Sequence, residues 1–216
     1  MQLLSVNIGQ KRVQRKGNEL ETTGIYKIPT LEPVQITRLG MQDDFVCDQK
    51  HHGGPDQAVY VYGAADYAWW AEELGRELQP GTFGENLTIS ELESARFNIG
   101  DRLHIGSVIL EVTAPRIPCS TLAARMGDPR FVRQYRNAAR PGLYCRVLQE
   151  GTVRAGDEVR AERREGEAVS ALEVFLDYYN REKDEARLRR FLRAPIAIRA
   201  RQDVERDLQK LLAESD

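Results

Sequence analysis

A Gly-Asp pair stands twice in the chain directly before a short run of alternating apolar and polar residues. Gly100-Asp101 precedes residues 102–105, and Gly156-Asp157 precedes residues 158–161. Glycine and aspartate are favoured in tight turns, and a period of two is typical of a half-buried strand. Short strands joined by such turns predict a closed or nearly closed β-barrel.

The first fifty residues contain no helical pattern. Extended segments are expected at residues 1–8, 24–29, 33–39 and 45–47, with a polar, basic loop after Gly9. Strands that follow one another without helices favour antiparallel β structure over βαβ units. Further strands are expected at residues 102–105, 108–113, 143–148 and 158–161.

One helix interrupts this β pattern. Trp70, Leu74 and Leu78 recur at every fourth position, which predicts a helix over residues 64–78 with a buried stripe. Pro80-Gly81 is expected to end it.

The pattern changes after the charged residues 162–167. Ser170 and Glu173 have the spacing of a capping box, which predicts the start of a helix. A second helix is expected over residues 184–193, and Pro195 opens a third. The expected domains are therefore a β-barrel domain over residues 1–163 and a three-helix domain over residues 170–216.

Composition excludes several classes of protein. The chain has 216 residues, of which 41% are hydrophobic and 30% charged, as in an ordinary soluble protein. No apolar run reaches the ~20 residues that span a bilayer, and the N-terminus lacks the pattern of a secretory signal. The net charge of −2 argues against nucleic acid as the main partner. The cytoplasm is the expected compartment.

Cys119 lies between the strand at residues 108–113 and a helical pattern at residues 121–126. Pro115 and Pro118 fix the backbone φ through this loop. With Ser120 as the expected N-cap, Cys119 would lie next to a helix N-terminus, three residues after Arg116. Both features favour a thiolate over a thiol. A reactive or metal-ligating cysteine is therefore favoured over a buried structural one, whereas Cys145, on the apolar face of a strand, is expected in the core.

Residues 50–58 read KHHGGPDQA. Neighbouring histidines on a strand point to opposite sides, and no third ligand stands nearby, so a zinc site is not expected. The Gly-Gly pair would let backbone amides approach an anion, while Lys50, His51 and His52 supply donors. A Gly/Pro hairpin with exposed histidines is the alternative.

Arginines dominate the chain after Cys119. Seven of them occur between residues 116 and 146, against the single acid Asp128. They form either a solvated basic surface or an anion-binding wall beside the cysteine. Asn86, in a Gly-rich turn, could bind a polar ligand edge or simply hold that turn.

These segments together resemble the MOSC family, named after the C-terminal domain of molybdenum-cofactor sulfurase. The resemblance rests on residues 50–58 (KHHGGPDQA), 83–88 (FGENLT), 100–101 (GD) and 115–119 (PRIPC), in that order. The helical tail is similar to that of the YiiM-like bacterial branch, which adds a small three-helix domain at the C-terminus. The resemblance covers nearly the entire chain.

The resemblance implies a mainly β fold, which is a MOSC-type antiparallel β-barrel with peripheral helices and a small C-terminal three-helix appendage. It also implies a molybdenum cofactor of the molybdopterin type rather than pyridoxal phosphate. The implied enzyme is an oxidoreductase that reduces N-hydroxylated compounds such as hydroxylaminopurine bases. A soft thiolate suits the metal of such a cofactor.

The predicted site gathers residues that lie far apart in the sequence. Cys119, His51 and His52 are the expected catalytic residues, with Cys119 as the metal ligand and a histidine as proton donor near neutral pH. The expected cofactor-binding residues are these three together with Lys50, Gly53, Asn86 and Arg116. We expect these residues to converge on one pocket.

The expected partners are a small N-hydroxylated substrate and a separate electron-donor protein, because flavin and nicotinamide motifs are absent. Nucleic acid and membrane are not expected, and a homodimer is compatible with the sequence. Two other functions stay open, which are a sulfur carrier with a persulfide on Cys119 and a non-catalytic module that binds an anionic ligand. Bound molybdenum would separate the reductase from both.

Overall fold

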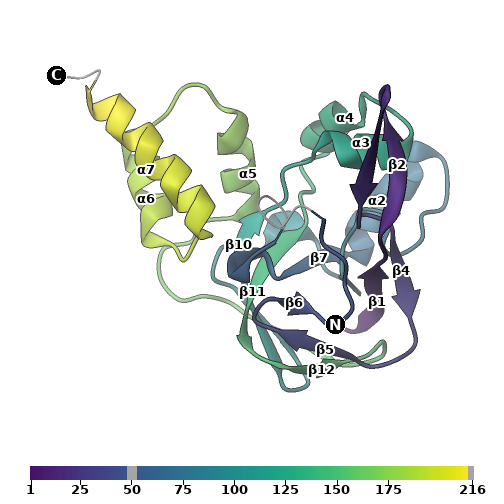
Figure 1. The fold of residues 1–216 in the computed structure, drawn as a ribbon. Coiled ribbons are helices and arrows are strands. Elements are labelled where there is room, and N and C mark those ends of the chain that lie inside the picture. Colours follow the sequence, from purple (N-terminus) through teal and green to yellow (C-terminus); the bar gives the residue numbers. More distant parts are fainter. Residues whose placement is uncertain (48–52, 214–216) are drawn as a thin grey trace.

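The computed structural model describes residues 1–47 and 53–213, and its largest element is a strongly twisted eight-stranded sheet (Figure 1). The strand order is β13-β9-β10-β11-β7-β8-β1-β4. The strands are β1 (Leu3–Gly9), β4 (Lys27–Thr30), β7 (Val59–Gly63), β8 (Leu87–Ile89), β9 (Arg102–Ile105), β10 (Val108–Pro115), β11 (Leu143–Gln149) and β13 (Val159–Glu162). The mainly β character that the sequence predicts is confirmed.

The predicted closed barrel is not found, because the sheets formed by the described residues are open. The sheet does curve back on itself, since Gln2, just before the second-last strand β1, forms an isolated antiparallel bridge with Glu158, just before the edge strand β13. The strands of the large sheet are mostly antiparallel, as predicted, but one βαβ unit was not expected. Strands β7 and β8 pair in parallel, and helix α2 (Ala64–Leu74) lies in the crossover between them. A parallel pair requires such a crossover.

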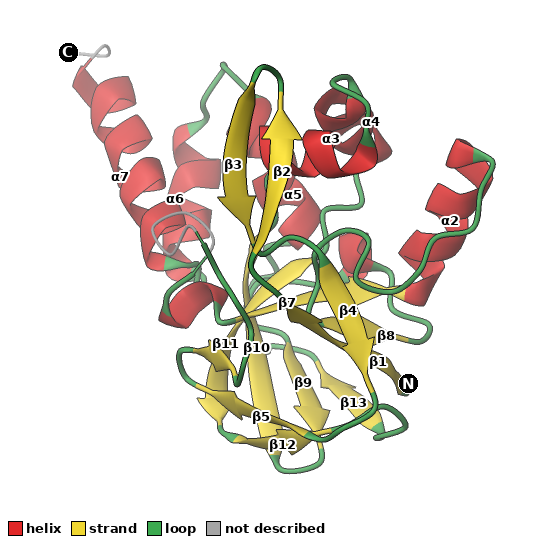
Figure 2. Cartoon of the chain, turned by 45° about the vertical axis from the view of Figure 1, so that its right-hand side comes forward, coloured by secondary structure: helices red, strands yellow, loops and turns green. Residues whose placement is uncertain are grey.

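Two smaller sheets complete the β structure. One has the order β12-β5-β6, from β12 (Gly151–Val153), β5 (Val34–Thr37) and β6 (Gly40–Met41). The other is a hairpin of β2 (Arg12–Lys16) and β3 (Glu19–Thr23), which projects from the body (Figure 2). The sequence predicted a polar loop at β2. A two-stranded ribbon that exposes Val13 and Leu20 buries too little apolar surface to show the usual strand pattern.

Both Gly-Asp turns have the predicted geometry. Gly100 and Gly156 adopt φ values of 90° and 99°. The Oδ2 atom of Asp101 accepts a hydrogen bond from the backbone nitrogen of Asn98 at 2.9 Å, and Asp157 Oδ2 accepts the equivalent bond from Arg154 at 2.9 Å. Each aspartate thus closes the turn that starts three residues before it.

Helix α2 begins where the sequence predicts but ends four residues early, at Leu74. Gly75 adopts a left-handed conformation with φ 61°, and its N–H bonds to the carbonyls of Ala71 and Glu72. This glycine cap ends the helix before Pro80-Gly81 is reached. Trp70 is fully buried, as the predicted stripe requires.

Two short helices follow the Cys119 loop, α3 (Ser120–Met126) and α4 (Phe131–Ala138). Helix α4 was not predicted from the sequence. Its Phe131 and Tyr135 are fully buried against Trp70, with ring centroids 5.1 and 5.9 Å from that indole. The two aromatic residues, four positions apart, were the signal for this helix.

Three helices form the C-terminal tail, α5 (Ala171–Tyr179), α6 (Glu185–Arg193) and α7 (Ile198–Ala213). The predicted capping of α5 is confirmed, because Ser170 Oγ accepts from the Glu173 nitrogen at 3.0 Å. Leu188 and Phe191 belong to the same core cluster as the sheet. The division into two domains, over residues 1–163 and 170–216, therefore stays a prediction.

Two short 3₁₀ helices also link elements, η1 (Pro55–Gln57) and η2 (Ser94–Arg96). Among the described residues, no helix combines the length and the apolar composition needed to cross a membrane.

Candidate functional site

A cavity of about 600 Å³ lies where the hairpin, the Cys119 loop and the helical tail meet. Its described lining comes from β2 and β3, the segments at 44–47 and 57–60, the turn at 84–86, the loop at 115–121, and Tyr144 of β11. The tail contributes Tyr178 from α5, and Arg199 and Asp203 from α7. Segments from the whole length of the chain therefore surround one space.

Cys119 lines this cavity and is half-buried. It is itself the N-cap residue of α3, because its carbonyl accepts from the nitrogens of Leu122 and Ala123 at 3.1 and 3.2 Å. The sequence assigned the cap to Ser120, which is instead the first residue of the helix. The proline-containing loop and the helix start thus hold the Cys119 backbone from both sides.

Arg116, from the same loop as Cys119, also lines the cavity and is only 4% exposed. Its Nη1 donates to the Phe83 carbonyl, and its guanidinium lies 4.9 Å from the centre of the Tyr60 ring. Burial opposes its charge, yet the hydroxyls of Tyr144 and Tyr60 and the Cys119 sulfur raise the pKa of Arg116 above the ordinary arginine value. Its buried Nε has no hydrogen-bond partner among the described residues.

A buried polar chain forms another part of the lining. Lys27 Nζ donates to Asp44 Oδ1 at 2.5 Å, and Asn86 Nδ2 donates to Asp44 Oδ2 at 2.9 Å. Asn86 Oδ1 accepts from the Tyr60 nitrogen at 3.1 Å. Burial lowers the pKa of Lys27, and the charge of Asp44 opposes this shift. Both the nitrogen and the oxygen of the Asn86 amide are therefore used in hydrogen bonds within the protein. This supports the predicted role of Asn86 in holding its turn over that of binding a ligand edge.

The turn before Asn86 is tightly packed. Gly84 has φ 76°, and a Cβ atom there would lie 2.9 Å from Ile25 Cγ1 and 3.3 Å from Arg116 Nη1. Glu85 is fully buried, and its Oε1 accepts from Tyr67 and from the Gly81 nitrogen, both at 2.6 Å. Burial raises the pKa of Glu85, and these hydrogen bonds oppose the shift. At position 84, therefore, only glycine fits without displacing Ile25 or Arg116.

Three of the predicted site residues, Cys119, Arg116 and Asn86, line the same cavity. Lys50, His51 and His52 lie outside the described residues. Gly53 is not part of the lining, and its carbonyl accepts from Arg199 Nη2 at 3.3 Å. Cys145 is fully buried in the core, as predicted, and burial raises the pKa of its thiol.

The arginine-rich segment does not form a continuous wall of the cavity. Of its seven arginines, Arg116 alone is among the described lining residues. Others are used by the fold: Arg125 donates to the Thr82 carbonyl at 2.6 Å, Arg140 pairs with Asp66 at 2.8 Å, and Arg146 pairs with Asp56 at 3.0 Å.

Sequence reasoning missed several lining residues. Lys27, Asp44 and Cys47 come from the N-terminal fifty residues, and Arg199 and Asp203 come from the tail. No motif or spacing marked them, because they meet Cys119 only through the tertiary fold.

Comparisons with known proteins identify a matching family and related sequences. The MOSC domain family model matches residues 48–160. The Bacillus subtilis protein YflK, uncharacterised by its name, is 36% identical over 169 residues, which are 78% of this chain and 76% of that protein. A Gibberella moniliformis protein named "Reductase" is 32% identical over 176 residues, which are 80% of this chain but only 31% of that protein.

Solved structures show the same fold. The crystal structure of YiiM from Geobacillus stearothermophilus matches with a TM-score of 0.79 and 27% identity, over 96% of this chain and 98% of that one. YiiM from Escherichia coli matches with a TM-score of 0.74 and 22% identity, over 93% and 92% of the two chains. The matched segment contains the Cys119 loop, the Asn86 turn and the first Gly-Asp turn, and with the identity to YflK it shows that the chain belongs to the MOSC domain family.

Proposed function

We propose that this protein binds a molybdenum cofactor of the molybdopterin type in the cavity and reduces N-hydroxylated compounds with electrons from a separate protein. The observation that carries the proposal is the juxtaposition of Cys119 and the buried Arg116 in one cavity. Membership of the MOSC family and the Gibberella moniliformis relative named "Reductase" support it.

The described lining fits a cofactor with an anionic part that Arg116 could bind and a metal that the Cys119 sulfur could ligate. A buried guanidinium with an unpartnered Nε is costly unless a ligand supplies an acceptor. A phosphate or a pterin oxygen would be such an acceptor, because arginine binds planar anionic groups with fixed geometry. Gly84 keeps open the space beside Arg116 that a larger residue would fill.

When bound, the cofactor would supply a molybdenum centre able to exchange two electrons. Cys119 would hold the metal through its thiolate, a soft ligand in a proline-fixed loop. Arg116 would bind the anionic part of the cofactor, and the Lys27–Asp44–Asn86 chain would keep the opposite lining in place. Proton donation by His51 or His52 stays a prediction from the sequence.

A sulfur carrier uses the same activated thiolate, so the two functions must be tested together. Protein purified from a host that makes the cofactor should contain molybdenum and, given a chemical reductant, should reduce a hydroxylaminopurine base. The same sample should be labelled for a persulfide on Cys119. If wild-type protein lacks molybdenum while the persulfide is present, the reductase function is wrong and the carrier function replaces it.

A further inference from the structure

The helical tail supplies part of the cavity that contains Cys119, although no sequence motif in the tail indicates a function. Tyr178 of α5 and Arg199 and Asp203 of α7 all lie in the lining. We propose that Arg199 and Asp203 form a recognition wall for the substrate, which binds a planar group whose edge carries a hydrogen-bond acceptor beside a donor. This inference rests on the proposed function, because it assigns the substrate-binding side of the same cavity.

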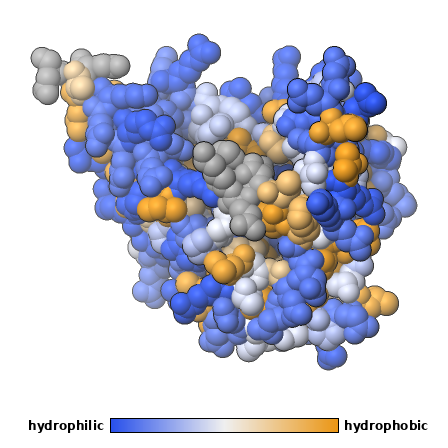
Figure 3. Space-filling view, viewed as in Figure 1, coloured by the Kyte–Doolittle hydropathy of each residue, from blue (hydrophilic) through white to orange (hydrophobic). Residues whose placement is uncertain are grey.

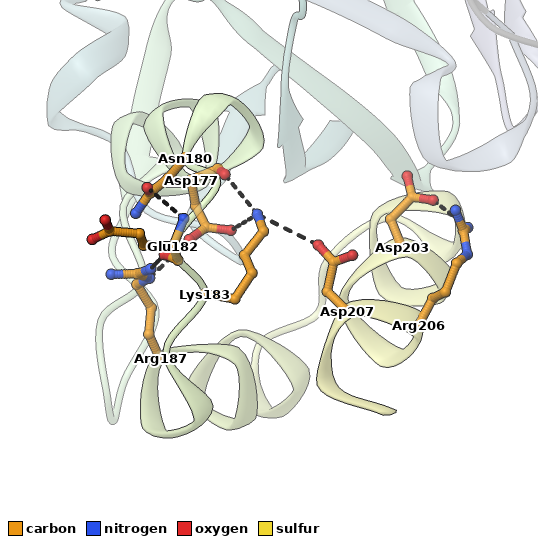
Figure 4. A network of polar contacts seen from close by, with 8 residues as sticks. All are labelled: Asp177, Asn180, Glu182, Lys183, Arg187, Asp203, Arg206 and Asp207. Carbon is orange, nitrogen blue, oxygen red and sulfur yellow. Dashed lines mark hydrogen bonds and ion pairs between the residues drawn. The ribbon is translucent and has the colours of Figure 1, made fainter. Parts of the chain in front are cut away.

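The spacing of the two residues gives the wall its chemistry. Residues four positions apart lie on the same face of a helix, about 5–6 Å apart at their Cβ atoms. A guanidinium only donates hydrogen bonds and a carboxylate only accepts them. Arg206 Nη2 pairs with Asp203 Oδ1 at 2.5 Å, which leaves Asp203 Oδ2 to accept from a ligand (Figure 4). Together, the guanidinium and this oxygen complement an amide-like or amidine-like edge rather than a purely anionic or purely apolar group. Tyr178 adds an aromatic surface suited to a planar ring.

The first turn of α7 is fixed to the body beside the cavity. Asp56 Oδ2 accepts from the Ile198 nitrogen at 2.7 Å, and the Thr113 carbonyl of β10 accepts from the Ala197 nitrogen at 3.0 Å. Arg199 Nη2 donates to the Gly53 carbonyl at 3.3 Å. These contacts set the position of the wall relative to the Cys119 loop, which directly follows β10.

A network of ion pairs also joins α5 to α7 (Figure 4). Lys183 Nζ lies 2.9 Å from Asp177 Oδ2 and 3.4 Å from Asp207 Oδ2, so it connects α5, which carries Tyr178, to α7, which carries the wall residues. Asp177 also pairs with Arg187 at 2.8 Å. Side chains held on linked helices are better placed for specific recognition than side chains on a loop.

The wall and Cys119 belong to one cavity of about 600 Å³, which a single planar ligand could occupy. Burial raises the pKa of the Tyr144 hydroxyl, while Arg116, the Cys119 sulfur and Arg199 all act on the same group. Tyr144, Cys119 and Arg199 all line the same cavity. In Figure 3 the visible outer face of the tail is mostly hydrophilic, with isolated apolar spots.

Binding energy from a part of the substrate remote from the reacting atom affects capture of that substrate more than cofactor retention. A hydroxylaminopurine base carries ring acceptor nitrogens beside N–H donors, whereas phenylhydroxylamine has a planar ring without them. In Arg199→Gln and in Asp203→Asn, kcat/KM for the hydroxylaminopurine base should fall about tenfold or more, mainly through KM. For phenylhydroxylamine it should stay within about twofold.

Two substitutions on the same helix are matched controls. Lys210→Gln removes a positive charge and Glu205→Gln removes a negative charge, and both residues are exposed on α7 outside the cavity lining. Neither control substitution should change kcat/KM for either substrate. The proposal is overturned if kcat/KM falls equally for both substrates in the two wall variants, or if these variants lose molybdenum. Wild-type kinetics with the hydroxylaminopurine base in both variants would also overturn it.

A binding measurement tests the wall independently of the proposed chemistry. Equilibrium dialysis of unloaded protein with adenine should show binding that Arg199→Gln and Asp203→Asn weaken by about tenfold and the controls do not. If wild-type protein shows no reductase activity but this pattern holds, the proposed function fails while the recognition wall stands. Equal adenine binding by wild type and both wall variants, or none by wild type, would contradict the wall.

Discussion

Asp56 Oδ2 accepts a hydrogen bond from the backbone nitrogen of Ile198 at 2.7 Å, and so joins the KHHGGPDQA segment directly to the first turn of α7. The other carboxylate oxygen of Asp56 pairs with Arg146 at 3.0 Å, and Arg146 also donates to the Pro195 carbonyl at 3.1 Å. Asp56 and Arg146 thus attach the start of α7 to the body of the protein.

Replacing Asp56 should therefore loosen the tail. Asp56→Ala removes the acceptor for the helix and one partner of Arg146, which should cost about 1–2 kcal/mol of unfolding free energy. Asp56→Asn keeps an acceptor oxygen and should cost less than half as much. Urea unfolding of both variants measures the difference, and equal losses would show that the helix contact contributes nothing.

Gly84 should be less tolerant of a side chain than Gly75, although both have positive φ. Gly75→Ala meets nothing within 4 Å and should cost only the left-handed backbone strain, about 1–2 kcal/mol. Gly84→Ala must also displace Ile25 or Arg116, which should add about 1–3 kcal/mol. Chemical unfolding of the two variants compares them directly. The same loss in both would mean that the packing beside Arg116 can relax freely.

Glu85 should make stability depend on pH. Its folded pKa is raised, so near the unfolded value of about 4.5 the folded state binds more protons than the unfolded state. The stability from this group is present below that value and is lost as the pH rises through the folded pKa. Glu85→Gln cannot titrate and should show a smaller loss in unfolding free energy between about pH 4.5 and about pH 8. An unchanged pH profile would contradict this assignment.

Arg116 should retain the cofactor, whereas an exposed arginine of the same segment should not. Arg116→Gln removes a charge-assisted contact worth about 1.5–3 kcal/mol, so the molybdenum content after gel filtration should fall about tenfold or more. Arg133→Gln, at an exposed position on α4, should keep wild-type content. Thermal unfolding of both variants provides a check, because loss of metal from a misfolded Arg116 variant would not count.

Local sequence patterns were sufficient to predict much of the fold. The Gly-Asp turns and the Ser170 cap depend on interactions within a few residues, and the structure confirms both. The buried side of α2 at Trp70 followed from helical periodicity and is also confirmed. Helix α2 ended early because a single glycine, Gly75, capped it. That signal was present in the sequence but was outweighed by the later proline.

Long-range features could not be predicted in the same way. Whether the sheet closes depends on which strands meet at its ends, and the parallel pairing of β7 with β8 depends on how α2 packs. The cavity lining shows the same limit. Arg116 and Cys119 share one loop and were found together, while Lys27 and Arg199 reach the cavity from opposite ends of the chain.

The most direct test of the account is the sulfur coordination of molybdenum in wild type, Cys119→Ser and Cys47→Ser, measured by X-ray absorption on protein from a host that makes the cofactor. Cys47 is the matched control, because it is exposed and lines the same cavity. We predict that Cys119→Ser loses the metal or one of its sulfur ligands, while Cys47→Ser matches wild type. Molybdenum with unchanged sulfur coordination in Cys119→Ser would contradict the claim that Cys119 holds the cofactor.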